Sequence, residues 1–331
     1  MTATQVRTEL ITEALRLACR APSLHNSQPW RWVLTDDSVE LFADPERFVR
    51  GADATGREAL ISCGAVLHHF RTAMAAAGWD TAVTRFPTAD DALHLASVQF
   101  TAARSVTEEQ RGRADAILLR HTDRLPFVAP PDPEALMHAL SAVAENHAVR
   151  LDVLSEDVHE FLAEASHLTE ALRRYDAEYH TELSWWTADF VSDDGIPRTS
   201  LVTATESDRV QIGRNFPVVA RTERRAEILD DRAAVLVLST LDESRESILR
   251  CGEALSALLL NATEAGLSSC TLTHITEMAQ GREVVAALVG TGTLPHVIVR
   301  LGQAPALAET PPPTPRRPIE HVLRIERSAP C

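Results

Sequence analysis

The stretch APSLHNSQPWRW, residues 21–32, separates a helical pattern from a strand pattern and has the periodicity of neither. Pro22 and Pro29 interrupt any helix that runs up to Arg20, because proline lacks a backbone donor and clashes with the preceding turn. The polar residues between the two prolines offer hydroxyl and amide groups for hydrogen bonds outside any helix or strand; they are Ser23, Asn26, Ser27 and Gln28. The stretch therefore predicts either a clamp that holds a ligand or a helix-terminating loop with surface amides.

Helical and strand patterns lie on both sides of this loop. Before it, residues 4–20 place their apolar side chains on one helical face. After it, Thr55 and Glu58 have the spacing of a capping box, which predicts a helix that runs from there to a stop at Gly78. The strands expected in this part of the chain are residues 31–34, 39–42, 82–86 and 93–100, the first two joined as a hairpin.

A second series of helices and strands begins near residue 108. The expected helices are residues 114–120, a helix from Pro133 behind the N-cap Asp132, a helix from Ser155 into the aromatic cluster at 175–186, and residues 248–265. The expected strands are residues 149–154, 233–240 and 296–301. Helices that cover a mixed sheet in this way predict an α+β or α/β sandwich.

Two of the expected helices share letters at a fixed offset. LISCGAVLHHFRTAMAAAG ends at Gly78 and ILRCGEALSALLLNATEAG ends at Gly266, and 266 − 78 = 188. The Cys-Gly pairs at Cys63 and Cys251 keep the same offset, since 251 − 63 = 188. A fixed register over a whole helix predicts duplication of a half-molecule. We place the halves at residues 1–107 and 108–331.

Periodicity fails between residues 187 and 231, where glycines, prolines and charges interrupt every apolar run. Long segments of this kind are either disordered or coverings of a functional site. Aromatic side chains flank the segment or lie in it, and they offer apolar surface for docking: Trp185, Trp186, Phe190 and Phe216. The segment is therefore interpreted as a lid, with disorder as the alternative.

Composition excludes several classes of function. The 331 residues carry 32 basic and 47 acidic side chains, a net charge of −15, which disfavours nucleic acid and anionic membranes as partners. Every basic residue is arginine, and without lysine neither a P-loop nor a pyridoxal Schiff base is available. The five cysteines form no CxxC pair, which indicates a reduced, cytoplasmic protein without a zinc site. No signal peptide or membrane-spanning run is expected.

The sequence RHTDR contains the most promising polar pattern after the opening loop. Arg120, Thr122 and Arg124 are spaced by two, so in an extended backbone all three side chains project to one face. Two guanidinium groups and a hydroxyl on one face predict a cradle for a phosphate or a carbonyl. Salt bridges to Asp123 or to other nearby acids explain the same residues without a ligand.

Two further stretches carry weaker signals. GLSSCTLTH, residues 266–274, turns through small hydroxylated residues, as a backbone beside a flat ring would, although a helix stop followed by a strand accounts for the same letters. In TPRRP the prolines extend Arg316 and Arg317, and a solvated basic tail is the alternative. His25 and His274 are possible proton donors or ordinary polar residues. No catalytic side chain and no metal ligand is assigned.

Taken in order, these stretches resemble the motifs of the nitroreductase-like flavoprotein family. APSLHNSQPW is similar to that family's APS..N.QPW loop, and RHTDR to its arginine-serine/threonine-arginine motif. GLSSC resembles its flavin-facing loop more loosely, and TPRRP its C-terminal basic pair. The whole chain, including CRAPSLHNSQPWRW and GREALISCGAVL, looks most like the Acg type of actinobacterial nitroreductase-like proteins.

The resemblance implies an α+β nitroreductase fold with FMN as cofactor. Members of the family are homodimers with FMN at the subunit interface. In this chain the proline-serine-asparagine loop belongs to the first half and the arginine motif to the second. One chain then assembles one complete site between its halves, as a monomeric pseudo-dimer, and the symmetry-related second site is degenerate.

The resemblance also implies roles for individual residues. Arg120, Thr122 and Arg124 would contact the flavin phosphate, ribityl chain and pyrimidine edge. The other implied contacts are Pro22, Ser23, Leu24 and Asn26 along the ring, Thr271, Leu272 and Thr273 at its N5 side, and Arg316 with Arg317 at the phosphate. NAD(P)H and then a small aromatic acceptor would stack on the open ring face. A closed lid would instead imply a flavin-sequestering protein of stress or dormancy, and a scaffold that has lost its cofactor is a third possibility.

Overall fold

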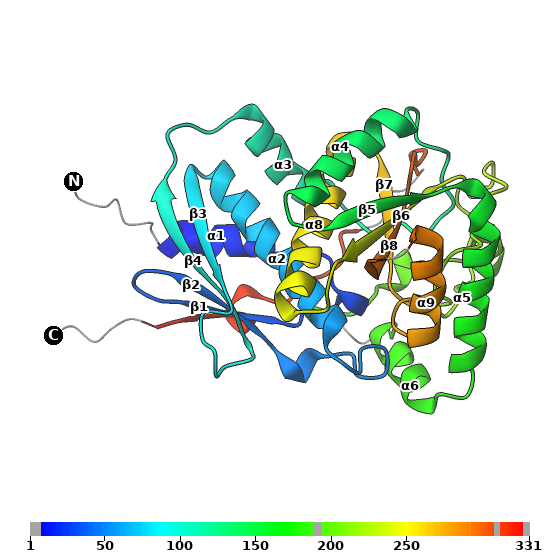
Figure 1. Ribbon diagram of the computed structural model, residues 1–331, viewed down its shortest axis with the longest axis horizontal. Helices are drawn as coiled ribbons and strands as arrows, with labels where there is room; N and C mark the ends of the chain where they lie inside the picture. Colours follow the sequence, from blue (N-terminus) through cyan, green and yellow to red (C-terminus); the bar gives the residue numbers. More distant parts are fainter. Residues whose placement is uncertain (1–7, 189–192, 291, 308–311, 327–331) are drawn as a thin grey trace.

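The structure is a computed structural model that describes residues 8–188, 193–290, 292–307 and 312–326. Residues 4–7 of the expected first helix, Phe190 of the expected lid and Cys331 lie outside the described residues. Two sheets lie on either side of a central pair of helices, α2 (Arg57–Ala76) and α8 (Arg245–Glu264) (Figure 1). The mixed composition of helices and sheets confirms the α+β class.

Both sheets repeat one strand order. The first contains, in spatial order, β3 (Trp79–Arg85), β4 (His94–Ala102), β2 (Val39–Ala43), β1 (Trp30–Leu34) and β9 (Leu323–Ile325). The second contains, from the corresponding edge, β7 (Ser268–Leu272), β8 (Leu294–Gly302), β6 (Ala234–Thr240) and β5 (Arg150–Leu154). The chain thus contains two units, one of β1 to β4 around α2 and one of β5 to β8 around α8. In each unit two strands precede the central helix and two follow it, and in the second unit further helices lie between β5 and β6 and between β7 and β8. All pairings are antiparallel except that of β9, which lies parallel to β1.

The two central helices correspond residue by residue. Arg57 and Arg245 begin them, and 245 − 57 = 188, the offset that the sequence shows. The helices cross where Gly64 meets Gly252: a Cβ atom on Gly64 would lie 2.0 Å from the Leu249 carbonyl oxygen. A Cβ atom on Gly252 would lie 2.0 Å from the Ile61 carbonyl oxygen. Only glycine permits this approach, which explains the repeated Cys-Gly pairs.

The remaining helices surround this centre. They are α1 (Thr8–Ala18), α3 (Glu108–Leu119), α4 (Pro133–Glu145), α5 (His159–Arg173), α6 (Ala177–Trp186), α7 (Ala204–Asp208) and α9 (Ala279–Val289). Asp132 caps α4 by accepting a hydrogen bond from the Ala135 amide at 3.1 Å, which confirms the predicted start. The helix expected from Ser155 is divided into α5 and α6, because Asp176 caps a new helix by accepting from the Tyr179 amide at 3.0 Å.

The predicted capping box at Thr55 and Glu58 is wrong. Gly56 is the N-cap of α2, with a left-handed φ of 76° and no side-chain cap. Asp53 instead accepts a hydrogen bond from the Ala59 amide at 2.9 Å. Glu58 turns inward, is 3% exposed and pairs with Arg57. Capping boxes are present at Thr107 and Thr203.

Within the described residues, none of the helices is long and apolar enough to cross a membrane. That part of the chain also holds no group of three or more histidine, cysteine or carboxylate side chains able to bind a metal.

Candidate functional site

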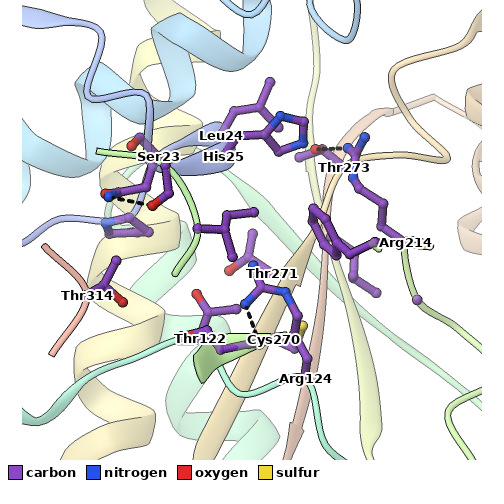
Figure 2. A pocket seen from close by; sticks show the side chains of 18 of the residues that line it. Ser23, Leu24, His25, Thr122, Arg124, Arg214, Cys270, Thr271, Thr273 and Thr314 are labelled. Atoms are coloured by element: carbon purple, nitrogen blue, oxygen red, sulfur yellow. Dashed lines mark hydrogen bonds between the residues drawn. The ribbon is translucent and has the colours of Figure 1, made fainter. Parts of the chain in front are cut away.

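A cavity between the two units gathers the candidate residues. The opening loop, the first turns of α2 and segment 195–216 line it together with RHTDR, β7 and Thr314–Arg316. Figure 2 shows side chains from these separate elements around the cavity, among them Ser23, Arg124, Thr273 and Arg214. The predicted residues that line it are Pro22, Ser23, Leu24, Asn26, Arg120, Thr122, Arg124, Thr271, Leu272, Thr273 and Arg316.

The opening loop has an unusual backbone conformation, and the side-chain amide of Asn26 holds it in place. His25, Asn26 and Gln28 have φ values of 51°, 58° and 52°, which non-glycine residues seldom adopt. Each such residue costs about 1–3 kcal/mol, so the surrounding contacts must hold it. Asn26 Nδ2 donates to the carbonyl oxygens of Gly195 and Pro315 at 2.9 and 3.0 Å. The Asn26 side chain therefore joins the loop to two distant segments of the chain, those at Gly195 and Pro315.

Arg317 lies apart from the other predicted residues. Its backbone amide donates to Gln28 Oε1 at 3.0 Å, and its guanidinium lies 3.7 Å from Asp44. It does not belong to the cavity lining, unlike its neighbour Arg316. Among the two arginines of TPRRP, only Arg316 is placed where it faces the cavity.

The RHTDR segment lies extended along β7, as its spacing predicts. Thr122 forms an isolated bridge with Ser269, and the Asp123 amide donates to the Ser269 carbonyl oxygen at 3.0 Å. Asp123 is paired with Arg225, whose Nη2 lies 2.6 Å from its carboxylate. Within the described residues, Arg120 and Arg124 form no ion pair with Asp123 or with another acid, and both line the cavity.

Two guanidinium groups of the cavity lining, one buried and one partly buried, lack a counter-charge among the described residues. Within that part of the chain, Arg120 donates to the Arg20 carbonyl oxygen alone, at 3.3 Å, and its Nε has no partner. Arg316 donates to five backbone carbonyl oxygens, those of Cys19, Arg20, Ala21, Thr314 and Pro315. Neither has a carboxylate within ion-pair distance in the part of the chain that the structure describes. Burial and the charge of Arg20 lower the pKa of Arg120 to about 10, and burial with the charges of Arg120 and Arg20 lowers the pKa of Arg316 to about 9.

His25 is buried in the cavity wall without a hydrogen-bond partner. The side chain is 6% exposed, and neither ring nitrogen is bonded among the described residues. Its ring meets Phe216 edge-on at 5.9 Å, and the Arg124 guanidinium lies over the same phenylalanine at 4.8 Å. Burial, with Arg214 and Arg124 nearby, holds the pKa of His25 well below its usual range. A neutral imidazole thus faces the cavity with its polar atoms unused.

Arg214, which the sequence did not single out, joins segment 195–216, called the covering segment below, to Tyr179 and Glu277. Its Nη1 donates to the Tyr179 hydroxyl at 3.0 Å, and its Nη2 donates to Glu277. Thr273 Oγ1 donates to the same carboxylate at 2.7 Å. Arg214 and Glu58 are lining residues that sequence reasoning missed, because Arg214 lies in an aperiodic segment and Glu58 matched a helix cap, whereas Phe216 was predicted to dock as part of the lid.

The buried neutral histidines predict loss of stability in acid. Burial lowers the pKa of His25, His69, His274 and His296 below the usual 6.5, that of His296 to about 3. As pH falls below 6.5 the unfolded chain takes up protons first, so the free energy of unfolding decreases by about 2 kcal/mol per histidine at pH 5. Glu58, whose pKa is raised, opposes this by gaining a proton in the folded state. Urea unfolding at pH 7.5 and 5 measures the difference.

His69→Gln is the matched variant for this experiment, because it removes one titrating group from the interior. Its free energy of unfolding is expected to depend less steeply on pH than that of the wild type. Equal free energies at pH 7.5 and 5 for the wild type would contradict the assignment of neutral buried histidines.

Comparisons with known proteins give close relatives in Mycobacterium tuberculosis. The chain is 57% identical over 322 residues, 97% of both chains, to a protein named "Putative NAD(P)H nitroreductase acg". A second protein of that organism, also named a NAD(P)H nitroreductase, is 37% identical over 324 residues, 95% of this chain and 91% of its own length. No protein-family model matches the chain.

Solved structures resemble the chain more distantly. A nitroreductase with bound FMN from Desulfitobacterium hafniense has a TM-score of 0.42 and 14% identity, over 65% of this chain and 98% of that one. The FMN-dependent nitroreductase NfnB of Mycobacterium smegmatis, in complex with NADPH, has a TM-score of 0.37 and 18% identity, over 60% of this chain and 89% of that one.

Proposed function

This chain belongs to the Acg-type family of NAD(P)H nitroreductase-like proteins, and we propose that it binds FMN between its two units and passes a hydride from NAD(P)H to a flat acceptor. The uncompensated arginine pair carries the proposal. Arg120 is 7% exposed and Arg316 is partly buried; both line a cavity formed by both units, and neither is paired with a described carboxylate. Burying two cations without a counter-charge is costly, and a dianionic phosphate supplies the missing charge.

The remaining lining residues suit the other parts of the flavin. Thr122 and Arg124 would face the ribityl chain and the pyrimidine edge, and Pro22, Ser23, Leu24 and Asn26 would lie along the ring. Thr271, Leu272 and Thr273 would approach its N5 side from the end of β7. When bound, FMN supplies the hydride chemistry, and the protein supplies its orientation and its electrostatic surroundings.

The repeated strand order supports a duplicated nitroreductase fold with halves at residues 1–107 and 108–331. β9 returns from the second half to extend the first sheet. At the place that corresponds to Thr273, since 273 − 85 = 188, the last residue of β3 is Arg85, and its charge is neutralised by the fully buried Glu253 of α8. This contrast favours one complete site and one degenerate site in a single chain, which would work in the cytoplasm as a monomer.

Absorbance of the purified protein tests the proposal directly. We expect a flavin spectrum, with one FMN per chain after reconstitution, that is bleached when NADPH or NADH is added without oxygen. A colourless protein that does not take up FMN would refute both flavin functions. A protein that binds FMN but is not reduced by either dinucleotide would refute the oxidoreductase function alone.

A second function, sequestration of the flavin in stress or dormancy, is favoured by the covering of the cavity. Residues of the covering segment, from Gly195 to Phe216, line it. Asn26 holds this segment at Gly195, and Arg214 holds it at Glu277. A dinucleotide would then reach the flavin only when these contacts open, and slow opening would make the protein a store rather than a reductase.

Access to the flavin is therefore expected to increase when the covering segment loses a packed side chain. Phe216→Ala removes the ring that His25 and Arg124 contact, so reduction of bound FMN by dithionite should become several-fold faster. Val218→Ala is the matched control: Val218 lies two residues beyond Phe216, its side chain is 55% exposed, and its loss should leave the rate unchanged. Equal rates in Phe216→Ala and the wild type would count against a lid.

A further inference from the structure

His25 is a polar group in the wall of the cavity that the proposed flavin contacts do not use. Its side chain is 6% exposed and lines the cavity, and neither ring nitrogen has a hydrogen-bond partner among the described residues. Figure 2 shows the ring on the side of the cavity where Arg214 and Thr273 also lie. A buried polar group without a partner is costly, so a ligand that bonds to it gains affinity.

Three other buried histidines show how this chain satisfies a histidine that serves packing. His69, His274 and His296 each bond one ring nitrogen to a serine or threonine hydroxyl, at 2.7–2.8 Å. None of these three side chains is among the residues that line the cavity. His25 differs from them in both respects, which favours a role toward a ligand over a role in the interior.

The backbone of the opening loop supports the same distinction. His25, Asn26 and Gln28 all have left-handed φ values, and the side-chain amides of Asn26 and Gln28 offset this strain by donating to carbonyl oxygens of distant segments. The His25 ring has no described polar contact of this kind and meets only the edge of the Phe216 ring, at 5.9 Å. Strained residues that the protein holds in place are concentrated at sites that bind ligands.

The surroundings of His25 determine what its ring can bind. Burial, with Arg214 and Arg124 nearby, holds the pKa of His25 well below its usual range, so the imidazole carries one N–H donor and one bare nitrogen. The two arginines offer donors alone and cannot accept this N–H. Their positive charges also favour an oxygen on which negative charge develops and disfavour a cationic ligand.

His25 lies where the opening loop meets the covering segment. Its neighbours Leu24 and Asn26 are the residues proposed to lie along the flavin ring, whereas His25 itself contacts Phe216 of the covering segment. A second flat ligand that enters between the flavin and this segment would pack against the Phe216 ring and meet the His25 imidazole at its edge. Flat apolar contact with one polar group to fix the orientation is the usual composition of such a site.

We infer that His25 recognises the acceptor by donating a hydrogen bond from its imidazole N–H to a carbonyl or nitro oxygen of a flat ligand that packs against Phe216. The inference rests on the proposed function. A nitro compound receives a hydride, whose two electrons come from NAD(P)H, and negative charge develops on its oxygens. One N–O bond then breaks to give a nitroso compound and hydroxide, which contains the transferred hydrogen. His25 keeps its proton throughout and binds and orients the acceptor.

Two variants of His25 and one control separate the imidazole from the rest of the loop. His25→Phe keeps a flat ring beside Phe216 and removes both nitrogens. His25→Asn is the second variant, because asparagine adopts the left-handed backbone readily while its short side chain does not reach as far as the imidazole. His138→Phe makes the first change at an exposed histidine of α4 outside the cavity lining.

Equilibrium binding to the oxidised FMN-loaded protein tests recognition without turnover. The ligands are 4-nitrobenzyl alcohol and 4-isopropylbenzyl alcohol, which differ in whether the substituent has oxygens, and the change in flavin absorbance reports binding. The wild type and His138→Phe should prefer the nitro compound by about 10-fold, the effect of one hydrogen bond to a buried group. Both His25 variants should lose this preference. An equal affinity for the two ligands in the wild type, or an unchanged preference in the His25 variants, would overturn the inference.

The affinity for FMN tests whether His25 serves the acceptor rather than the flavin. FMN titration of both His25 variants should give the wild-type dissociation constant, and weaker FMN binding in both would place the contact on the flavin and overturn the inference. Reoxidation of the photoreduced protein by 4-nitrobenzyl alcohol should be slower in His25→Phe by about 10-fold, whereas reoxidation by ferricyanide should not change.

Failure of the inference can be told apart from failure of the proposed function. A wild-type protein that takes up FMN and is reduced by NAD(P)H, yet binds neither alcohol, would overturn the role of His25 alone. A wild-type protein that does not take up FMN would refute the proposed function, and recognition of the acceptor by His25 with it.

Discussion

Replacing Arg120 and Arg316 together by methionine is expected to weaken FMN binding by about 10²–10⁴-fold. Each guanidinium would place a positive charge beside the phosphate, and a charge-assisted contact of this kind contributes about 1.5–3 kcal/mol per residue. Methionine preserves most of the side-chain volume, so the loss reports charge and hydrogen bonding rather than a new void. Fluorescence titration of the apoprotein with FMN measures the change, since free flavin fluorescence is altered when the ring is bound.

The same substitution at Arg120 alone separates a ligand site from a structural ion pair. Among the described residues its guanidinium makes one hydrogen bond, at 3.3 Å to the Arg20 carbonyl oxygen, and has no carboxylate partner. Removing an uncompensated buried charge relieves desolvation and repulsion, so the apoprotein with Arg120→Met should unfold at a higher temperature than the wild type. An arginine that served stability would give the opposite change.

Arg85→Met is the control for both measurements. Arg85 pairs with Glu253, which is 0% exposed, so its loss leaves a buried carboxylate short of one cation and should lower the unfolding temperature. FMN affinity should not change, because Arg85 lies outside the cavity lining. If Arg120→Met, Arg316→Met bound FMN as tightly as the wild type, the phosphate site would have to be elsewhere.

The sequence predicts the opening loop and RHTDR well because their signals are local. Prolines at 22 and 29 fix where the helix stops, and a spacing of two fixes which face the arginines share once the backbone is extended. The helical register with its Cys-Gly pairs is also visible, since a backbone crossing that admits no Cβ atom leaves a glycine in both helices. For the opening loop and RHTDR, the residues that determine the backbone lie within a few positions of one another; the glycines of the crossing are visible because the contact leaves the same residue in both helices.

The rest of the site depends on contacts between distant residues, which no local pattern encodes. Asn26 bonds to Gly195 and Pro315, and Arg214 reaches Glu277, across separations of 63 to 289 residues. Glu58 shows the opposite difficulty. Its spacing from Thr55 fits a capping box, yet Gly56 turns the chain so that the carboxyl group points inward. Glu58 therefore pairs with the buried Arg57 rather than capping the helix, although its spacing fits a cap.

Gly64→Ala and Gly252→Ala are expected to be the most destabilising single substitutions in the chain. Each new Cβ atom would lie 2.0 Å from a carbonyl oxygen of the opposite helix, and two packed backbones cannot yield as a flexible side chain can. Overpacking of this kind costs about 3 kcal/mol or more, a large share of the roughly 5–15 kcal/mol that stabilises a domain. The double variant should not fold, as urea unfolding of the soluble fraction would show.

Gly112→Ala in α3 is the control, because there the nearest obstacle is the end of the flexible Glu264 side chain, at 2.9 Å. Alanine favours the helix over glycine by about 1 kcal/mol, so this variant should be as stable as the wild type or more so. The crossing also sets the width of the cavity, since Ile61 of α2 and Leu255 of α8 line it from either side. Any folded fraction of Gly64→Ala should therefore bind FMN more weakly than Gly112→Ala. Wild-type stability in Gly64→Ala would mean that the two helices do not meet at their glycines. The proposed site between the two units would then lose its structural basis.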